Sequence, residues 1–181
     1  MHIAMDPAHA LVAYVRSPIG IFVENLRRDL HREYPELPAH ITILPPRRLL
    51  GTEEQARLHI ESVCREIEPF EIVMGDVETF APATPTVFIR VAHAAYRMRE
   101  LHDKLNIGVF AGVEPWPYMP HLTIVKLSDP EAAYDSAEIS RQRWVEFPGD
   151  RRILISELTF VRSGDADYSW IDLATIRLGG Y

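Results

Sequence analysis

The sequence has few of the features that mark secreted, membrane-spanning or metal-binding proteins. Its single cysteine, Cys64, cannot form a disulfide within the chain, and no group of cysteine and histidine residues has the spacing of a zinc site. No apolar run reaches the roughly 18 residues of a membrane helix, and residues 1–10 lack a basic stretch followed by an apolar one. We therefore expect a cytoplasmic protein without metal, cofactor, signal peptide or membrane partner.

Basic side chains are also scarce. The chain has 19 Lys and Arg residues against 26 Asp and Glu residues, which gives a formal net charge of −7. Proteins that bind duplex DNA place many basic side chains against phosphates, so this balance argues against duplex DNA as a partner. A nucleotide or an RNA terminus remains compatible with it. The length of 181 residues suits one compact domain, which we expect to be a monomer.

The order of apolar and polar residues predicts alternating strands and helices. Ser17-Pro18 offers an N-cap followed by proline in the first turn, and Thr52 with Gln55 forms a capping-box pattern. One expected helix follows Ser17-Pro18 with its apolar face from Ile19 to Leu30, and a second opens at the Thr52 capping box with its apolar face from Ala56 to Ile67. A third has its apolar face from Met98 to Leu105, and a fourth runs from Pro130 towards Trp144. The expected strands are 10–15, 40–44, 70–80, 87–91, 121–125, 152–161 and 168–178.

This order of elements repeats after the loop at residues 81–85. The sequence therefore predicts an α+β fold in a single bilobal domain, 1–181, with lobe one at about 1–83 and lobe two at about 84–181. Each lobe is expected to be a β-α-β-α-β unit, and a pseudo-twofold axis is expected to relate the two. The mostly antiparallel sheets would line a central cleft, with the helices outside.

Two similar tripeptides occupy corresponding strands of this repeat, His40-Ile41-Thr42 and His121-Leu122-Thr123. Because side chains alternate between the two faces of a strand, each His shares a face with its Thr, and the apolar residue between them faces the other way. If the apolar residues pack against the helices, both His-Thr pairs face the cleft.

Two imidazoles on opposite sides of a phosphodiester suit acid–base catalysis. Displacement at phosphorus needs one proton removed from the attacking group and another given to the leaving oxygen, and histidine titrates near neutral pH. His40 and His121 are therefore the candidate catalytic residues. Thr42 and Thr123 are the candidate phosphate contacts, through their hydroxyl groups. The alternative is that all four are structural residues of ordinary strands.

The segments PAHITIL and MPHLTIV resemble the paired HxTx signatures of the two-histidine phosphoesterase superfamily, the 2′,5′ RNA ligase-like or cyclic phosphodiesterase proteins. The resemblance implies a bilobal α+β fold around a groove and metal-independent catalysis by His40 and His121. It also implies phosphate contacts from Thr42 and Thr123, and substrates such as 2′,3′-cyclic phosphates or 2′,5′-linked nucleotides. A role in RNA processing would follow.

Three further residues are candidates for substrate binding: Arg47, Tyr118 and Lys126. Arg47 follows the first tripeptide and can pair with a phosphate. Many members of the superfamily carry a basic residue shortly after the second motif, which Lys126 resembles. Strict alternation places Lys126 on the face opposite His121, unless the strand contains a bulge. Side chains that can stack on a base are Trp116, Tyr118, Tyr168 and Trp170.

The residues leave several functions open. The leading one is hydrolysis of a 2′,3′-cyclic phosphate or a related RNA-type phosphodiester. The same site run in reverse would join RNA ends as a 2′,5′ RNA ligase, and the sequence does not separate the two reactions. A non-catalytic module that binds a nucleotide or RNA end in the same cleft is another alternative. A metallohydrolase is the last, and it would lose its activity in chelator.

Overall fold

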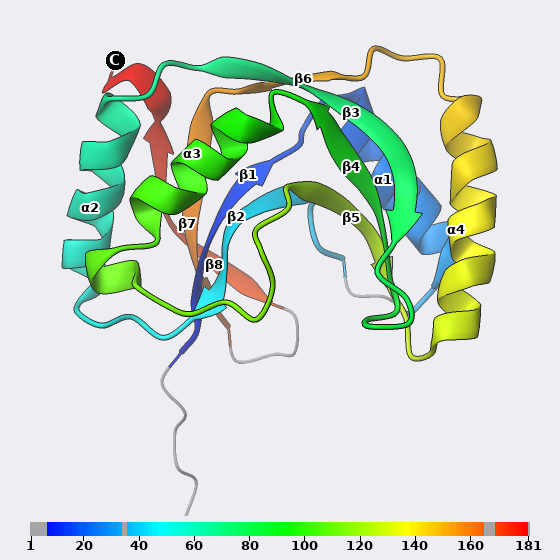
Figure 1. Ribbon diagram of the computed structural model, residues 1–181, viewed down its shortest axis with the longest axis horizontal. Coiled ribbons are helices and arrows are strands. Elements are labelled where there is room, and N and C mark those ends of the chain that lie inside the picture. Colours follow the sequence, from blue (N-terminus) through cyan, green and yellow to red (C-terminus); the bar gives the residue numbers. More distant parts are fainter. Residues whose placement is uncertain (1–6, 34–35, 165–168, 181) are drawn as a thin grey trace, which may run out of the picture.

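The computed structural model describes residues 7–33, 36–164 and 169–180, and within them the chain forms one mixed α+β fold (Figure 1). The helices are α1 (Pro18–Leu30), α2 (Glu53–Arg65), α3 (Ala95–Leu105) and α4 (Pro130–Val145), with short 3-10 turns at Gly108–Phe110 and Leu178–Gly180. The strands are β1 (His9–Tyr14), β2 (His40–Arg47), β3 (Phe70–Thr79), β4 (Thr86–His93), β5 (His121–Lys126), β6 (Arg152–Ile155), β7 (Glu157–Ser163) and β8 (Trp170–Arg177). The expected class and the helices outside the sheet are confirmed.

All eight strands belong to one curled antiparallel sheet, in the order β6-β3-β4-β5-β2-β1-β7-β8. The two strands that carry the tripeptides, β2 and β5, are neighbours at its centre. The main core fills the space between one face of the sheet and the helices, and it contains Ile41, Ile43, Leu122 and Ile124. A small apolar cluster of Ala10, Val12 and Val161 lies apart from this core. The His-Thr pairs are thus free to face away from the helices.

Local signals position the helices as expected. Thr52 caps α2: its side chain accepts a hydrogen bond from the Gln55 backbone N–H, and the Gln55 side chain accepts one from the Thr52 backbone N–H. Ser17 occupies the N-cap position of α1 and Pro18 follows it, but the Ser17 side chain makes no capping hydrogen bond. The proline therefore contributes more to this helix start than the serine does.

The expected strand at residues 152–161 is wrong, because that segment forms two strands. β6 pairs with β3 at one edge of the sheet, whereas β7 lies between β1 and β8 in the other half. The change of partner occurs at Ser156, between the buried residues Ile155 and Leu158. The final expected strand is found from Trp170 onward, and Tyr168 lies outside the described residues.

The centre of the sheet, between β5 and β2, separates two halves. One half contains β6, β3, β4 and β5, and the other contains β2, β1, β7 and β8. Each half combines strands from before and after residue 83, because pairing between strands is set by contacts distant in sequence. The expected division into lobes at about 1–83 and about 84–181 stays a prediction. None of the described helices is long and apolar enough to cross a membrane.

Candidate active site

The pairing of β2 with β5 brings the two tripeptides into direct contact. The strands run antiparallel with Ile41 opposite Leu122. This register places His40 across from Thr123, and Thr42 across from His121. The central residues are fully buried and the four polar side chains are partly exposed. The two histidines are therefore diagonal neighbours on one face, and such residues lie roughly 7–8 Å apart, with a somewhat shorter distance between their Cβ atoms.

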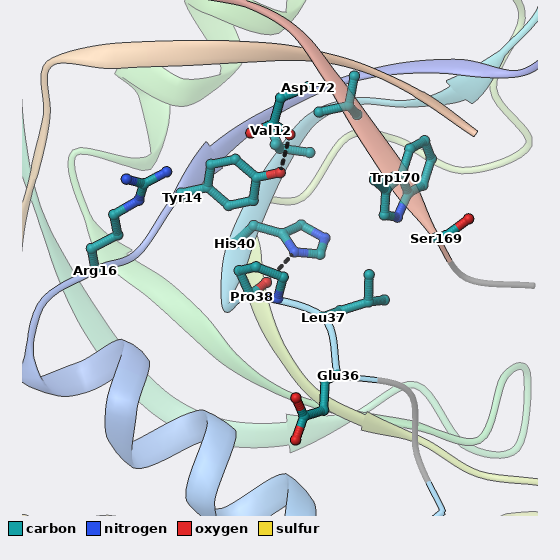
Figure 2. A pocket seen from close by; sticks show the side chains of 11 residues that line it. Val12, Tyr14, Arg16, Glu36, Leu37, Pro38, His40, Ser169, Trp170 and Asp172 are labelled. Atoms are coloured by element: carbon teal, nitrogen blue, oxygen red, sulfur yellow. Dashed lines mark hydrogen bonds between the residues drawn. The ribbon is translucent and has the colours of Figure 1, made fainter. Parts of the chain in front are cut away.

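The same hydrogen bond orients each imidazole. His40 Nδ1 lies 2.8 Å from the carbonyl oxygen of Pro38, and His121 Nδ1 lies 2.7 Å from that of Met119. Because a carbonyl oxygen can only accept, Nδ1 carries the proton in both rings, and Nε2 of the neutral ring has a free electron pair. Figure 2 shows the second ring nitrogen of His40 on the side of the ring away from Pro38. Each ring can thus accept or return one proton at Nε2.

The surroundings of both rings favour the neutral form. Burial lowers the pKa of His40 and of His121, and the hydrogen bond to the backbone carbonyl opposes this only in part. The positive charge of Lys126 lowers both pKa values further. An imidazole kept neutral in this way is ready to act as a base near neutral pH, and a bound anionic phosphate would favour the protonated form of its partner.

A bulge in β5 turns Lys126 toward the histidines. Val125 pairs with Val87 and Thr123 pairs with Phe88, so Ile124 is an extra residue in its strand. Both Ile124 and Val125 are buried, and the alternation of faces resumes with Lys126 exposed on the side of His121. The expectation from strict alternation, which placed Lys126 on the opposite face, is wrong for this reason.

Arg47 lies in a buried network rather than in the open cleft. Its side chain is 11% exposed and donates to the carbonyl oxygens of Pro45 and Phe110, to Asn106 Oδ1 and to the carboxylate of Glu114. A phosphate would have to replace these bonds to reach the guanidinium. The structure therefore places Arg47 as an anchor for the loop between α3 and β5.

Tyr118 lines the cleft, but its hydroxyl is engaged. It donates to the backbone carbonyl of Thr42 over 2.9 Å, and its ring stacks on His102 at 4.3 Å. Burial raises the pKa of Tyr118, so the phenol remains a hydrogen-bond donor. This places Tyr118 directly behind one of the two threonines.

Two cavities of different chemistry flank the pair of histidines. The one beside His121 has a volume of about 550 Å³ and is mainly apolar. Its lining includes Phe80, Pro115, Trp116, Pro117 and Tyr118. The one beside His40 has a volume of about 360 Å³ and is more polar (Figure 2). Its lining includes Tyr14, Arg16, Glu36, Trp170 and Asp172.

Most of these cavity residues were not candidates from the sequence. Tyr14 pairs with His40 across β1 and β2, and Asp172 accepts a hydrogen bond from the Tyr14 hydroxyl over 2.7 Å. The rings of Phe80 and Phe88 lie 5.2 and 5.1 Å from that of His121. Only the register between strands identifies these neighbours, and no local motif marks them. Among the described residues, no group of three or more His, Cys, Asp or Glu side chains is arranged to hold a metal ion.

Comparison with known proteins decides the family. Residues 15–167 match the model of a family described as the 2′-5′ RNA ligase superfamily. The chain belongs to this superfamily. The family expected from the paired HxTx signatures is thereby confirmed, since this superfamily is that of the two-histidine phosphoesterases.

Several relatives carry names of the same kind. A protein of Oceanobacillus iheyensis, named provisionally as a phosphoesterase, is 31% identical over 106 residues, which cover 56% of this chain and 59% of the relative. A similarly named protein of Staphylococcus epidermidis is 22% identical over 161 residues, 87% of this chain and 90% of its own length. The chain thus spans less than two thirds of the first relative and most of the second.

Solved structures share the fold. E. coli LigT in complex with ATP has a TM-score of 0.61, and a protein of Thermus thermophilus has a TM-score of 0.63. Both are 14% identical, and the matches cover 96% of this chain and 99% and 98% of the two structures. E. coli LigT has also been solved with 3′-AMP. At this identity the likeness establishes the architecture of the curled sheet and its helices.

Proposed function

We propose that this protein is a metal-independent phosphodiesterase that acts on 2′,3′-cyclic phosphates or 2′,5′-linked RNA-type phosphodiesters. The observation that carries the proposal is the paired geometry of His40 and His121. Both rings are held through Nδ1 by a backbone carbonyl, on adjacent strands and on one face of the sheet. A phosphodiester between them would have one Nε2 on each side.

The two histidines divide the proton transfers. One neutral ring removes a proton from the attacking water, and the other, protonated, gives a proton to the leaving oxygen. Each such transfer contributes typically about 10²–10⁴ to the rate. The two act as a unit, so their separate contributions do not multiply. The burial that lowers both pKa values supports the base role, and the negative phosphate supports the charged form of the acid.

Thr42, Thr123 and Lys126 stabilise the phosphate. Each threonine lies directly across the strand pair from the histidine of the other tripeptide, and its hydroxyl can donate to a non-bridging oxygen while charge accumulates there. The ammonium of Lys126 acts on the same charge over a longer range. Its positive charge lowers the pKa of both imidazoles, which supports a position near enough to act on a phosphate bound beside them.

The apolar cavity supports a nucleotide as substrate. Trp116 is 68% exposed beside a row of prolines, and a base can stack on such a ring at low cost. The complexes of LigT with ATP and 3′-AMP point in the same direction. A cytoplasmic location, a monomeric state and a role in RNA processing are part of this proposal.

A substrate panel tests the proposal. Wild type and a His40→Ala/His121→Ala double variant are compared on 2′,3′-cyclic nucleotides, on 2′,5′-linked dinucleotides, and on RNA with a 5′-hydroxyl end for ligation. Hydrolysis by wild type alone is the expected result. Joining of RNA ends without hydrolysis would favour the ligase. Equal rates for the two proteins on every substrate would favour a binding module.

A further inference from the structure

The polar cavity beside His40 is lined by charged and hydroxyl-bearing side chains that have no part in the proposed proton transfers. It extends from β2 across β1 and β7 to β8, because Tyr14 pairs with His40 and Asp172 pairs with Val161. These residues share the face that carries the histidines. Any group attached to the reacting phosphate on the side of His40 would therefore lie over Tyr14 and reach Asp172 (Figure 2).

The cavity is built to accept hydrogen bonds from a neutral ligand. Among the described residues that line it, the carboxylates are Asp172 and Glu36, and the one guanidinium, that of Arg16, lies 5.3 Å from the centre of the Tyr14 ring. The Tyr14 hydroxyl donates to Asp172 Oδ1 and so holds the carboxylate in place. A carboxylate has about four acceptor positions, so Asp172 can accept from ligand hydroxyls as well.

Charge separates the possible ligands. In the described part of the lining, two carboxylates against one guanidinium disfavour a second phosphate. Vicinal hydroxyls of a sugar suit a carboxylate, as in the recognition of ribose by acidic residues. The indole of Trp170 adds an apolar wall against which a sugar or a base can pack. The volume of about 360 Å³ is at the small end of ligand pockets, and it suits one sugar-sized group.

We infer that this cavity binds the neutral, hydroxyl-bearing sugar of a second nucleoside, joined through the phosphate that lies between His40 and His121. The inference rests on the proposed function and narrows it. The first base occupies the apolar cavity by Trp116, and the second sugar occupies the polar cavity by Asp172. A 2′,5′-linked dinucleoside monophosphate fills both cavities, whereas a cyclic mononucleotide fills only one.

Binding of two probes tests the inference. The probes are adenylyl-(2′→5′)-adenosine and adenosine 2′,3′-cyclic phosphate, and the dissociation constants are measured by calorimetry in a His121→Asn background to prevent turnover. Asp172→Asn keeps the size of the side chain and can still accept from Tyr14. It is expected to weaken binding of the dinucleoside about tenfold, the loss of one charge-assisted hydrogen bond. Binding of the cyclic phosphate should change less than about twofold.

Asp150→Asn is the matched control, because Asp150 is an exposed carboxylate paired with Arg152 and lines neither cavity. An equal loss for both probes after Asp172→Asn, or no loss for either, would overturn the inference.

Tryptophan fluorescence gives a second readout. In a Trp116→Phe variant, Trp170 and the buried Trp144 remain, so quenching by the dinucleoside and not by the cyclic phosphate is expected. Equal quenching by both probes would contradict it.

Failure of the inference is distinguishable from failure of the proposed function. Turnover of cyclic phosphates by wild type decides whether the protein is a phosphodiesterase. The Asp172→Asn binding data decide only what occupies the polar cavity, since they need no catalysis.

Discussion

Arg27 supports the bulge that turns Lys126 toward the cleft. It extends from α1, is 6% exposed, and donates to the carbonyl oxygens of Ile124 at 2.6 Å, Leu37 at 2.6 Å and Thr123 at 3.0 Å. Two of these carbonyls belong to Ile124, the extra residue of the bulge, and to Thr123, which precedes it in β5. The guanidinium therefore stabilises the bulged conformation of the backbone, which a regular strand does not adopt.

Arg27→Met should lower the free energy of unfolding by about 3–5 kcal/mol. Each bond from a charged donor is worth about 1.5–3 kcal/mol, and the apolar replacement recovers part of the total by burying its own surface. For a chain of this length the loss lowers the Tm by on the order of 10 °C. Loss of the bulge also moves Lys126 away from both imidazoles. The folded variant should therefore be less active than wild type at equal concentration.

Urea unfolding monitored by circular dichroism measures the effect, and Arg28→Met is the matched control. Arg28 is the next residue of the same helix, is exposed, and donates to the Asn25 side chain. Its variant should change the free energy of unfolding by less than about 0.5 kcal/mol. A change of under about 1 kcal/mol for Arg27→Met would refute the argument that the guanidinium holds the bulge.

Three further predictions concern single side chains. Lys126→Met removes a positive charge that disfavours protonated imidazole, so the pKa values of His40 and His121 should rise; an NMR titration that shows unchanged or lower values would contradict this. Tyr118→Phe deletes the hydroxyl that donates to Thr42 and should cost about 1–2 kcal/mol of stability with a fall in kcat rather than a rise in KM, which melting curves and steady-state kinetics will measure. Burial raises the pKa of the Cys64 thiol to about 12, so native protein at pH 8 should resist Ellman's reagent and react once unfolded in urea; fast labelling of the native form would be the opposing result.

The sequence predicted the elements of the fold where the signal is local. The Thr52–Gln55 capping box and Pro18 mark helix starts that the structure places within one residue. The prediction of a single strand at 152–161 was wrong because a local sequence pattern does not show which other strand a strand pairs with. In the structure, buried residues alternate at Ile153 and Ile155 and then shift phase to Leu158, but the sequence hides this alternation because Leu154 is also apolar. That shift marks the point where the chain leaves one edge of the sheet for the other half.

The residues of the candidate site likewise fall into those that a local sequence signal identifies and those that it does not. His40 and His121 could be found because each carries its own tripeptide, with an apolar residue that packs on the core. Tyr14 and Asp172 could not, because Tyr14 joins the site by strand pairing with His40, and Asp172 joins it by a hydrogen bond to Tyr14 across 158 positions of sequence. Lys126 could be named as a candidate, but the face of the sheet on which it lies depends on the bulge in β5. The buried Arg27 of α1 stabilises that bulge, and the sequence around Lys126 does not show this contact.

The two-histidine mechanism is best tested by the pH dependence of 2′,3′-cyclic nucleotide hydrolysis by wild type, His40→Ala and His121→Ala, in excess chelator. Wild type should show chelator-insensitive turnover with a bell-shaped pH profile, because one ring must be neutral and the other protonated. Both variants should lose about 10²-fold or more in kcat. Turnover abolished by chelator, or retained by either single variant, would contradict the two-histidine mechanism.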